Sequence, residues 1–145
     1  MSLQIWLKNS WLVEHITSAQ EVADLLGVAD RDLEDCQSQG LSADWRMNIA
    51  YNAALQTATA ALAAAGFRAS RDAHHYRVIQ SLAYTIDADI KLIAQFDQFR
   101  KKRNIGGYER AGLVSNAEAD EMIALARELR KEIEMWIRTK YPQLF

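Results

Sequence analysis

The chain has 145 residues, of which half are apolar and a quarter are charged, and its formal net charge is −2 at pH 7. This apolar content excludes an intrinsically disordered chain, and one Pro with six Gly excludes collagen-like and Pro-rich classes. At this length we expect one domain, residues 1–145, with a sizeable buried core. Because Cys36 stands alone, no intramolecular disulfide can form, which is typical of a cytoplasmic protein.

The N-terminal half predicts helices rather than strands or a membrane segment. The longest apolar run, residues 58–67, is too short to cross a bilayer, and residues 1–11 lack the blocks of a signal peptide. Residues 1–16 are apolar enough to pack on a helical bundle or across a dimer. Ser18 with Glu21 predicts a capping box that opens a helix toward Cys36, which Gly40 closes. No segment alternates apolar and polar residues for the length of a strand.

The following helices are predicted from caps and apolar spacing. Ser42 caps an Ala-rich helix that Gly66 ends, and its small side chains favour a place at the centre of the bundle. After a short link around residues 67–71, helix resumes through Val78 and Leu82, restarts near Asp87, and is interrupted by two glycines at 106–107. A second capping box at Ser115 opens the last helix, which Pro142 stops. The sequence therefore predicts an all-α fold, a single up-and-down bundle of four to five helices.

Charge is segregated along the chain. Residues 14–44 carry eight acidic residues against Arg31 alone, whereas residues 68–110 carry nine bases against five acids. Such asymmetry is typical of a protein with one acidic and one basic face, the basic one suited to a polyanion. Ordinary surface helices also carry charge, so this alternative stays open.

Motifs for common chemistry are absent from the sequence. It has no phosphate-binding glycine loop, no HExxH and no CxxC, so no cofactor is expected. Asp72, His74 and His75 lie close together, but neighbouring residues on a helix point about 100° apart, so we expect no metal site. A pocket around Trp45, Tyr51, His75 and Tyr84 would serve a small-molecule-binding bundle, although a core uses aromatic residues at the same spacing.

One basic stretch stands out, and two interpretations of it remain open. Four consecutive bases end a helix, Asn104 follows them, and Tyr108 comes after the two glycines; the bases are Arg100, Lys101, Lys102 and Arg103, with Arg110 beyond the turn. Cations at a helix C-terminus also complement the helix macrodipole, and glycine is an ordinary helix stop. The alternative is a nucleic-acid-binding turn, in which the glycines bring Tyr108 back toward Arg103.

These residues resemble the HEPN superfamily of small prokaryotic helical-bundle proteins. The order of segments is similar over most of the chain: the Ala-rich helix to Gly66, the His74–His75 pair, the helix ending in Arg103 and Asn104, and the last helix to Pro142. The family motif is an Arg, a polar residue and, a few residues on, a His. Arg103 and Asn104 match its first two elements, and Tyr108 stands where the family has His.

The resemblance implies a function in RNA metabolism. Family members with the full motif are metal-independent endoribonucleases, in which Arg103 and Asn104 would hold the phosphate and ribose. Tyr108 is a poor base because its unperturbed pKa is about 10, so we expect RNA or nucleotide binding with weak or no cleavage. The family further implies a homodimer and a nucleotidyltransferase or antitoxin partner that could modify Tyr108. A non-catalytic module that binds a protein partner, with the acidic helix from Ser18 as the contact, is the alternative.

Overall fold

The chain folds into six α-helices and one small sheet in the part described by this computed structural model, residues 2–106 and 114–145, with only the backbone described for 104–106. The elements in chain order are α1 (Leu3–Lys8), β1 (Leu12–Glu14), α2 (Ala19–Asp35), α3 (Ala43–Ala64), β2 (Phe67–Ala69), α4 (His74–Thr85), α5 (Ile90–Gly106) and α6 (Asn116–Lys140), followed by a 3-10 turn, Pro142–Leu144. Within this described part, none of the helices combines the length and the apolar character that crossing a membrane requires.

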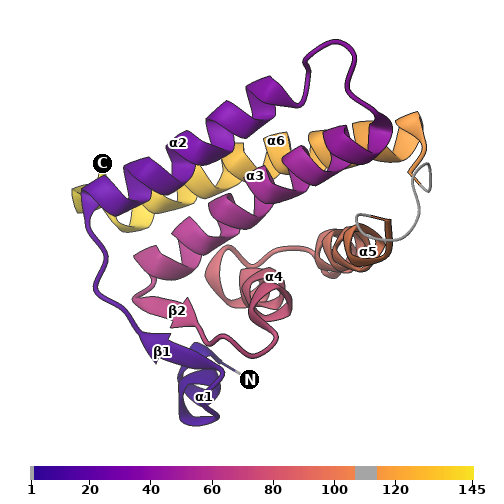
Figure 1. Ribbon diagram of the computed structural model, residues 1–145. Helices are drawn as coiled ribbons and strands as arrows, with labels where there is room; N and C mark the ends of the chain where they lie inside the picture. Colours follow the sequence, from indigo (N-terminus) through magenta and orange to yellow (C-terminus); the bar gives the residue numbers. More distant parts are fainter. Residues whose placement is uncertain (1, 107–113) are drawn as a thin grey trace.

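α3 lies at the centre of the fold, as its alanines predict (Figure 1). It packs against α2, α4, α5 and α6, and most of its residues are buried. Ser42 caps it, since its hydroxyl accepts from the Trp45 amide at 3.2 Å. The backbone of Gly66 then takes a left-handed conformation, φ +98°, which ends the helix at little cost.

The helices are not arranged as a simple up-and-down bundle. In Figure 1, α2, α3 and α6 lie side by side, with α2 antiparallel to the other two, whereas α4 and α5 are seen nearly end-on and so run across them. The helix number also exceeds the expected four to five, because residues 3–8 form α1 with Ser2 as its cap. The all-α class is confirmed, and the helices form one continuous hydrophobic core.

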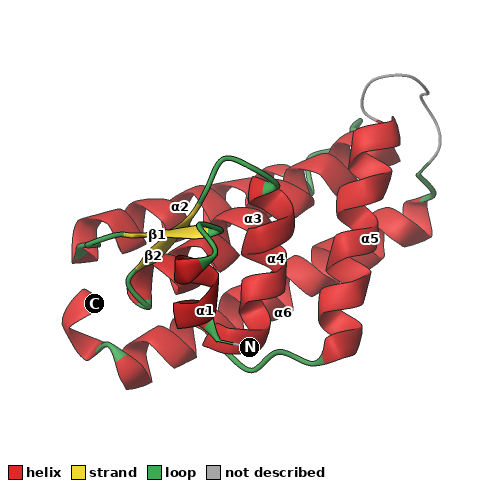
Figure 2. Ribbon diagram, turned by 90° about the horizontal axis from the view of Figure 1, so that it is seen from below, coloured by secondary structure: helices red, strands yellow, loops and turns green. Residues whose placement is uncertain are grey.

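The expectation that the chain forms no strand is wrong. β1 pairs antiparallel with β2 in the register Leu12 with Ala69, Val13 with Arg68 and Glu14 with Phe67. The two strands are drawn in yellow in Figure 2. Three residues are too few for an alternating pattern to be recognised, and their pairing depends on segments more than 50 positions apart. The sheet holds the N-terminal segment against the end of α3.

Of the two predicted capping boxes, only one is complete in the structure. The box at Ser115 is complete, with Glu118 bonded back to the Ser115 amide at 3.1 Å. At Ser18 only the hydroxyl caps the helix, whereas the Glu21 carboxylate accepts from Thr17 at 2.7 Å and lies 2.6 Å from His15 Nε2. The linker before α2 therefore uses the carboxylate that was expected at the cap.

The N-terminal segment packs on the bundle of its own chain. Trp6 is buried, and its ring lies 5.3 Å from Tyr84 and 5.8 Å from Trp11. Arg77 of α4 stacks on Trp11 at 3.8 Å, which joins the segment to the bundle. Trp45, in contrast, is 62% exposed, so it belongs to neither the core nor the N-terminal aromatic group. It lies in the first turn of α3, beyond the stripe that faces the other helices.

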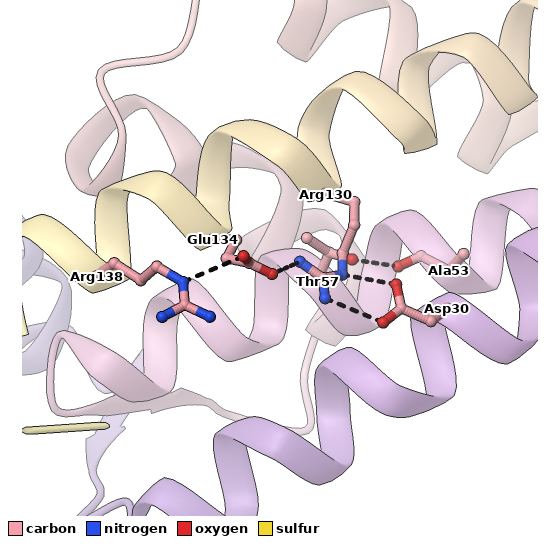
Figure 3. Close-up of polar contacts among 6 residues, drawn as sticks. All are labelled: Asp30, Ala53, Thr57, Arg130, Glu134 and Arg138. Atoms are coloured by element: carbon pink, nitrogen blue, oxygen red, sulfur yellow. Dashed lines mark hydrogen bonds and ion pairs between the residues drawn. The ribbon is translucent and has the colours of Figure 1, made fainter. Parts of the chain in front are cut away.

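An ion-pair cluster of four residues, Asp30, Arg130, Glu134 and Arg138, joins α2 to α6 (Figure 3). Arg130 lies 2.8 Å from Asp30 and 2.8 Å from Glu134, which also pairs with Arg138 at 3.1 Å. Burial alone would lower the pKa of Arg130, but its hydrogen bonds to Asp30 and Glu134 together outweigh this effect and raise that pKa. Each charged side chain of this cluster therefore has a partner of opposite charge at the contact between α2 and α6.

Candidate functional site

The last turns of α5 present the predicted bases, and most of them have acidic neighbours. Arg100 Nε lies 2.7 Å from Asp97 Oδ1, and Lys101 Nζ lies 3.6 Å from the second oxygen of the same carboxylate. Lys102 pairs with Glu118 at the start of α6. Three of the four consecutive bases are thus partly neutralised within the chain, which weakens the expected attraction for a polyanion.

Arg103 differs from these three bases. Its guanidinium lies 5.1 Å from the ring centroid of Tyr51, a residue of the central helix α3. Among the residues that the structure describes, no carboxylate pairs with Arg103. A guanidinium without a carboxylate partner attracts anions, and its planar fork of donors matches phosphate oxygens.

Tyr51 connects Arg103 to α4. The side chain is fully buried, its ring packs edge-on against Phe96 at 5.6 Å, and its hydroxyl lies 3.2 Å from Nδ1 of His75. Burial raises the pKa of Tyr51 to about 12, although Arg103 and Arg100 act in the opposite direction. The phenol therefore stays protonated at neutral pH and serves as a fixed hydrogen-bond partner for the imidazole.

His75 is held in its neutral form. Burial, followed by the positive charge of Arg103 and the neighbours His74 and Arg100, lowers the pKa of His75 below its usual value. Its Nδ1 is engaged by Tyr51, and within the described part of the chain Nε2 makes no hydrogen bond. We call this group of Arg103, Tyr51 and His75 the Arg103 site. It combines a cation, a neutral imidazole and a protonated phenol from three helices.

The other predicted site residues are only partly described. Asn104 belongs to the last turn of α5, and its side chain lies outside the described residues. Tyr108 and Arg110 both lie outside the described residues, so their predicted roles stay predictions. Gly106 is the final residue of α5, and thus the helix reaches the first of the two glycines that were expected to interrupt it.

The pocket expected for a small-molecule-binding bundle is not formed as such. Tyr51 and His75 do meet, but Tyr84 packs on Trp6 and Trp45 faces solvent. The sequence offered no signal that Arg103 would lie beside Tyr51 and His75, because α3, α4 and α5 come together only through tertiary packing.

The two adjacent histidines diverge, as helical geometry predicts. His74 Nδ1 lies 3.3 Å from the carbonyl oxygen of Ser70, whereas His75 bonds to Tyr51. In residues 2–106 and 114–145 there is no group of three or more His, Cys, Asp or Glu side chains that could hold a metal ion. The side chains of the Arg103 site supply a cation, an imidazole and a phenol.

Comparison of the chain with protein-family models, with curated proteins and with solved structures finds no match. The class that the structure itself defines is a mostly helical bundle with a small two-stranded sheet and a basic site between α3, α4 and α5. Membership of the HEPN superfamily remains a prediction from the order of segments and the motif.

Proposed function

We propose that the protein binds RNA or a nucleotide through the Arg103 site, as the HEPN resemblance implies. The observation that carries this proposal is the position of Arg103: it stacks on the buried ring of Tyr51 and has no carboxylate partner in the described part of the chain. A phosphate would supply the missing anion, and the uncharged imidazole of His75 would meet a ribose or phosphate oxygen nearby.

His75 is a better candidate than Tyr108 for any proton transfer at this site. In metal-independent cleavage the ribose 2′-oxygen loses its proton to a base and attacks the phosphorus, and the 5′-oxygen leaves with a proton from solvent. A base must be unprotonated at neutral pH, which the lowered pKa of His75 provides and an ordinary tyrosine does not. Arg103 would stabilise the negative charge of the transition state.

The test is binding and cleavage of a structured RNA in EDTA by wild type, Arg103→Ala and His75→Ala. His74→Ala is the matched control, because it removes the adjacent imidazole, whose ring nitrogen bonds to Ser70 instead of Tyr51. Tyr108→His restores the family motif. Thermal unfolding of each variant verifies that the fold is kept.

The outcomes separate binding from catalysis. Loss of RNA affinity in Arg103→Ala with His74→Ala unchanged supports the binding site, and cleavage that disappears in His75→Ala supports an enzyme. If wild type is inert and Tyr108→His gains activity, the scaffold is a nuclease fold without its base. RNA binding that Arg103→Ala leaves unchanged contradicts the proposal.

A non-catalytic protein-binding module is the second candidate, and the surface of α2 favours it. Asp24, Glu34 and Asp35 are exposed along this helix, which packs against α3 and α6 on its other side. A basic partner, such as a nucleotidyltransferase or antitoxin, would dock on this acidic surface of α2. A second copy of the chain would dock there or at the Arg103 site. Light scattering of the purified protein gives its mass in solution, and a monomer contradicts the expected homodimer.

A further inference from the structure

The solvent side of α4 presents an exposed tyrosine, Tyr76, whose two chain neighbours make contacts in different directions. Successive residues of a helix point about 100° apart. His75 meets Tyr51 of α3, whereas Arg77 stacks on Trp11 of the N-terminal segment at 3.8 Å. Tyr76 therefore points between these two contacts, and it is 37% exposed. In both Figure 1 and Figure 2, α4 lies between α1 and α5.

Two guanidinium groups lie beside the ring of Tyr76. Arg77 of α4 and Arg100 of α5 are each 5.5 Å from its ring centroid. Arg100 is held in place by Asp97, whose carboxylate oxygen lies 2.7 Å from its Nε. This ion pair compensates part of the charge of Arg100, but a guanidinium plane and an aromatic ring remain side by side at the contact between the two helices.

Arg77 resembles Arg103 in its surroundings. Within the described part of the chain, no carboxylate forms an ion pair with it. Its Nε is buried and makes no hydrogen bond to any described residue, and its guanidinium lies on the ring of Trp11. A stacked guanidinium without an acidic partner supplies both positive charge and a flat surface.

Arg100 connects this surface to the Arg103 site. Arg100 and Arg103 are about one helical turn apart on α5. Both of them also act electrostatically on Tyr51 and on His75, so the two guanidinium groups share one neighbourhood. Positive charge and aromatic rings therefore alternate from the end of α5, across Tyr76, to the N-terminal segment.

This alternation matches the chemistry of an unpaired RNA strand. Its phosphates bind guanidinium groups, and its bases stack on aromatic rings and on arginine planes. In a duplex the bases stack on one another, so their faces do not reach a ring on a protein surface. We propose that Tyr76, with Arg77 and Arg100 beside it, is a base-stacking surface next to the Arg103 site, and that the RNA bound here is single-stranded. This inference rests on the proposed function, because it names the kind of RNA that the Arg103 site holds.

The experiment measures binding of three RNA probes to the full chain by fluorescence anisotropy at fixed salt. The first probe is a single-stranded oligouridylate of about ten nucleotides, within the usual site sizes of single-strand-binding surfaces. The second is its duplex with oligoadenylate, and the third is a strand of the same length without bases. The oligouridylate is expected to bind more tightly than the duplex, and roughly five- to 100-fold more tightly than the strand without bases.

Variants of Tyr76 separate stacking from charge. Tyr76→Leu should weaken oligouridylate binding roughly five- to 100-fold, the range for one stacked base, and should leave the strand without bases unaffected. Tyr76→Phe keeps the ring and should bind like wild type. Tyr84→Leu is the matched control, because Tyr84 is also 37% exposed on α4 but packs on Trp6.

Variants of Arg77 test whether a phosphate reaches the N-terminal segment. Arg77→Met should reduce the slope of log affinity against log salt by about 0.7, the value for one phosphate of a single strand. Arg77→Lys keeps the charge and should restore the slope. Thermal unfolding of every variant verifies that the fold is kept.

The measurements distinguish a failure of this inference from a failure of the proposed function. Oligouridylate binding that Tyr76→Leu leaves unchanged, or a duplex bound as tightly as the single strand, overturns the inference. A loss of affinity in Arg103→Ala would in that case still support the proposed function. Binding that Arg103→Ala leaves unchanged overturns the proposed function, whatever Tyr76→Leu does, and absence of RNA binding overturns both.

Discussion

The α2–α6 ion-pair cluster and the Arg103 site use the same residue type in opposite ways. Arg130 has two carboxylate partners, both within 2.8 Å of its guanidinium. Arg103 has an aromatic ring and a neutral imidazole instead, with Arg100 nearby on the same helix. Positive charge is compensated in the first region and accumulated in the second.

The difference separates structural from functional charge. A compensated pair contributes modestly to stability and has no remaining attraction for a ligand. A guanidinium such as that of Arg103, which has no carboxylate partner among the described residues and lowers the pKa of a neighbouring histidine, is costly for folding and useful for binding an anion. Exchanging or removing single side chains in the two regions should therefore affect different measurements.

The largest expected effect is on RNA or nucleotide affinity. Arg103→Ala should weaken binding roughly 10- to 100-fold, because a charge-assisted hydrogen bond to phosphate is worth about 1.5–3 kcal/mol. Fluorescence anisotropy at fixed salt measures this. Arg130→Ala is the control from the other region, and equal losses in both variants would contradict the comparison.

The free energy of unfolding, in contrast to RNA affinity, should depend on Arg130 in the α2–α6 cluster. Arg130→Met should lower the free energy of unfolding by about 1–2 kcal/mol, because Asp30 and Glu134 lose their shared partner and the side chain is only 17% exposed. Urea unfolding monitored by circular dichroism gives this value. A variant as stable as wild type would show that the cluster contributes nothing.

The hydroxyl of Tyr51 should contribute less to the free energy of unfolding than the α2–α6 cluster does. Tyr51→Phe removes the hydroxyl that meets His75 but keeps the ring against Phe96, so we expect a loss of about 1 kcal/mol in urea unfolding. The imidazole signals of His75 should shift in the same variant. If both measurements are unchanged, the hydrogen bond between these residues is not formed in solution.

A smaller effect is expected from pH. Because the folded state lowers the pKa of His75, the unfolded chain binds this proton first, and the contribution of His75 to stability falls as pH drops below about 6.5. The lowered pKa values of Glu134 and Glu21 remove further stability below about pH 4.5. Melting temperatures between these limits should decline less in His75→Gln than in wild type.

The smallest expected effect is on the salt dependence of RNA binding. Lys101 is 65% exposed, and its 3.6 Å contact with Asp97 neutralises its charge only in part, so the remainder is available to a phosphate. Lys101→Met should reduce the slope of log affinity against log salt by about 0.7, the value for one phosphate of a single strand. An unchanged slope would place Lys101 outside the interface.

Local signals in the sequence located most helices. Ser42, Ser115 and Gly66 act through hydrogen bonds or backbone angles within a few residues, and the helices begin and end where these residues predict. The strand pair was missed because each strand has three residues and its partner is distant in the chain. The crossing of α4 and α5 over the other helices depends on the packing of whole faces, which no local pattern records.

The candidate site shows the same division. The sequence by itself determined an all-α chain with a basic helix end at Arg103, because helix periodicity and charge are properties of neighbouring residues. Only the tertiary structure decided that Tyr51 and His75 would join Arg103, and that Lys102 would be paired with Glu118. Each of these contacts joins two different helices, so its geometry exists only when the helices are packed together.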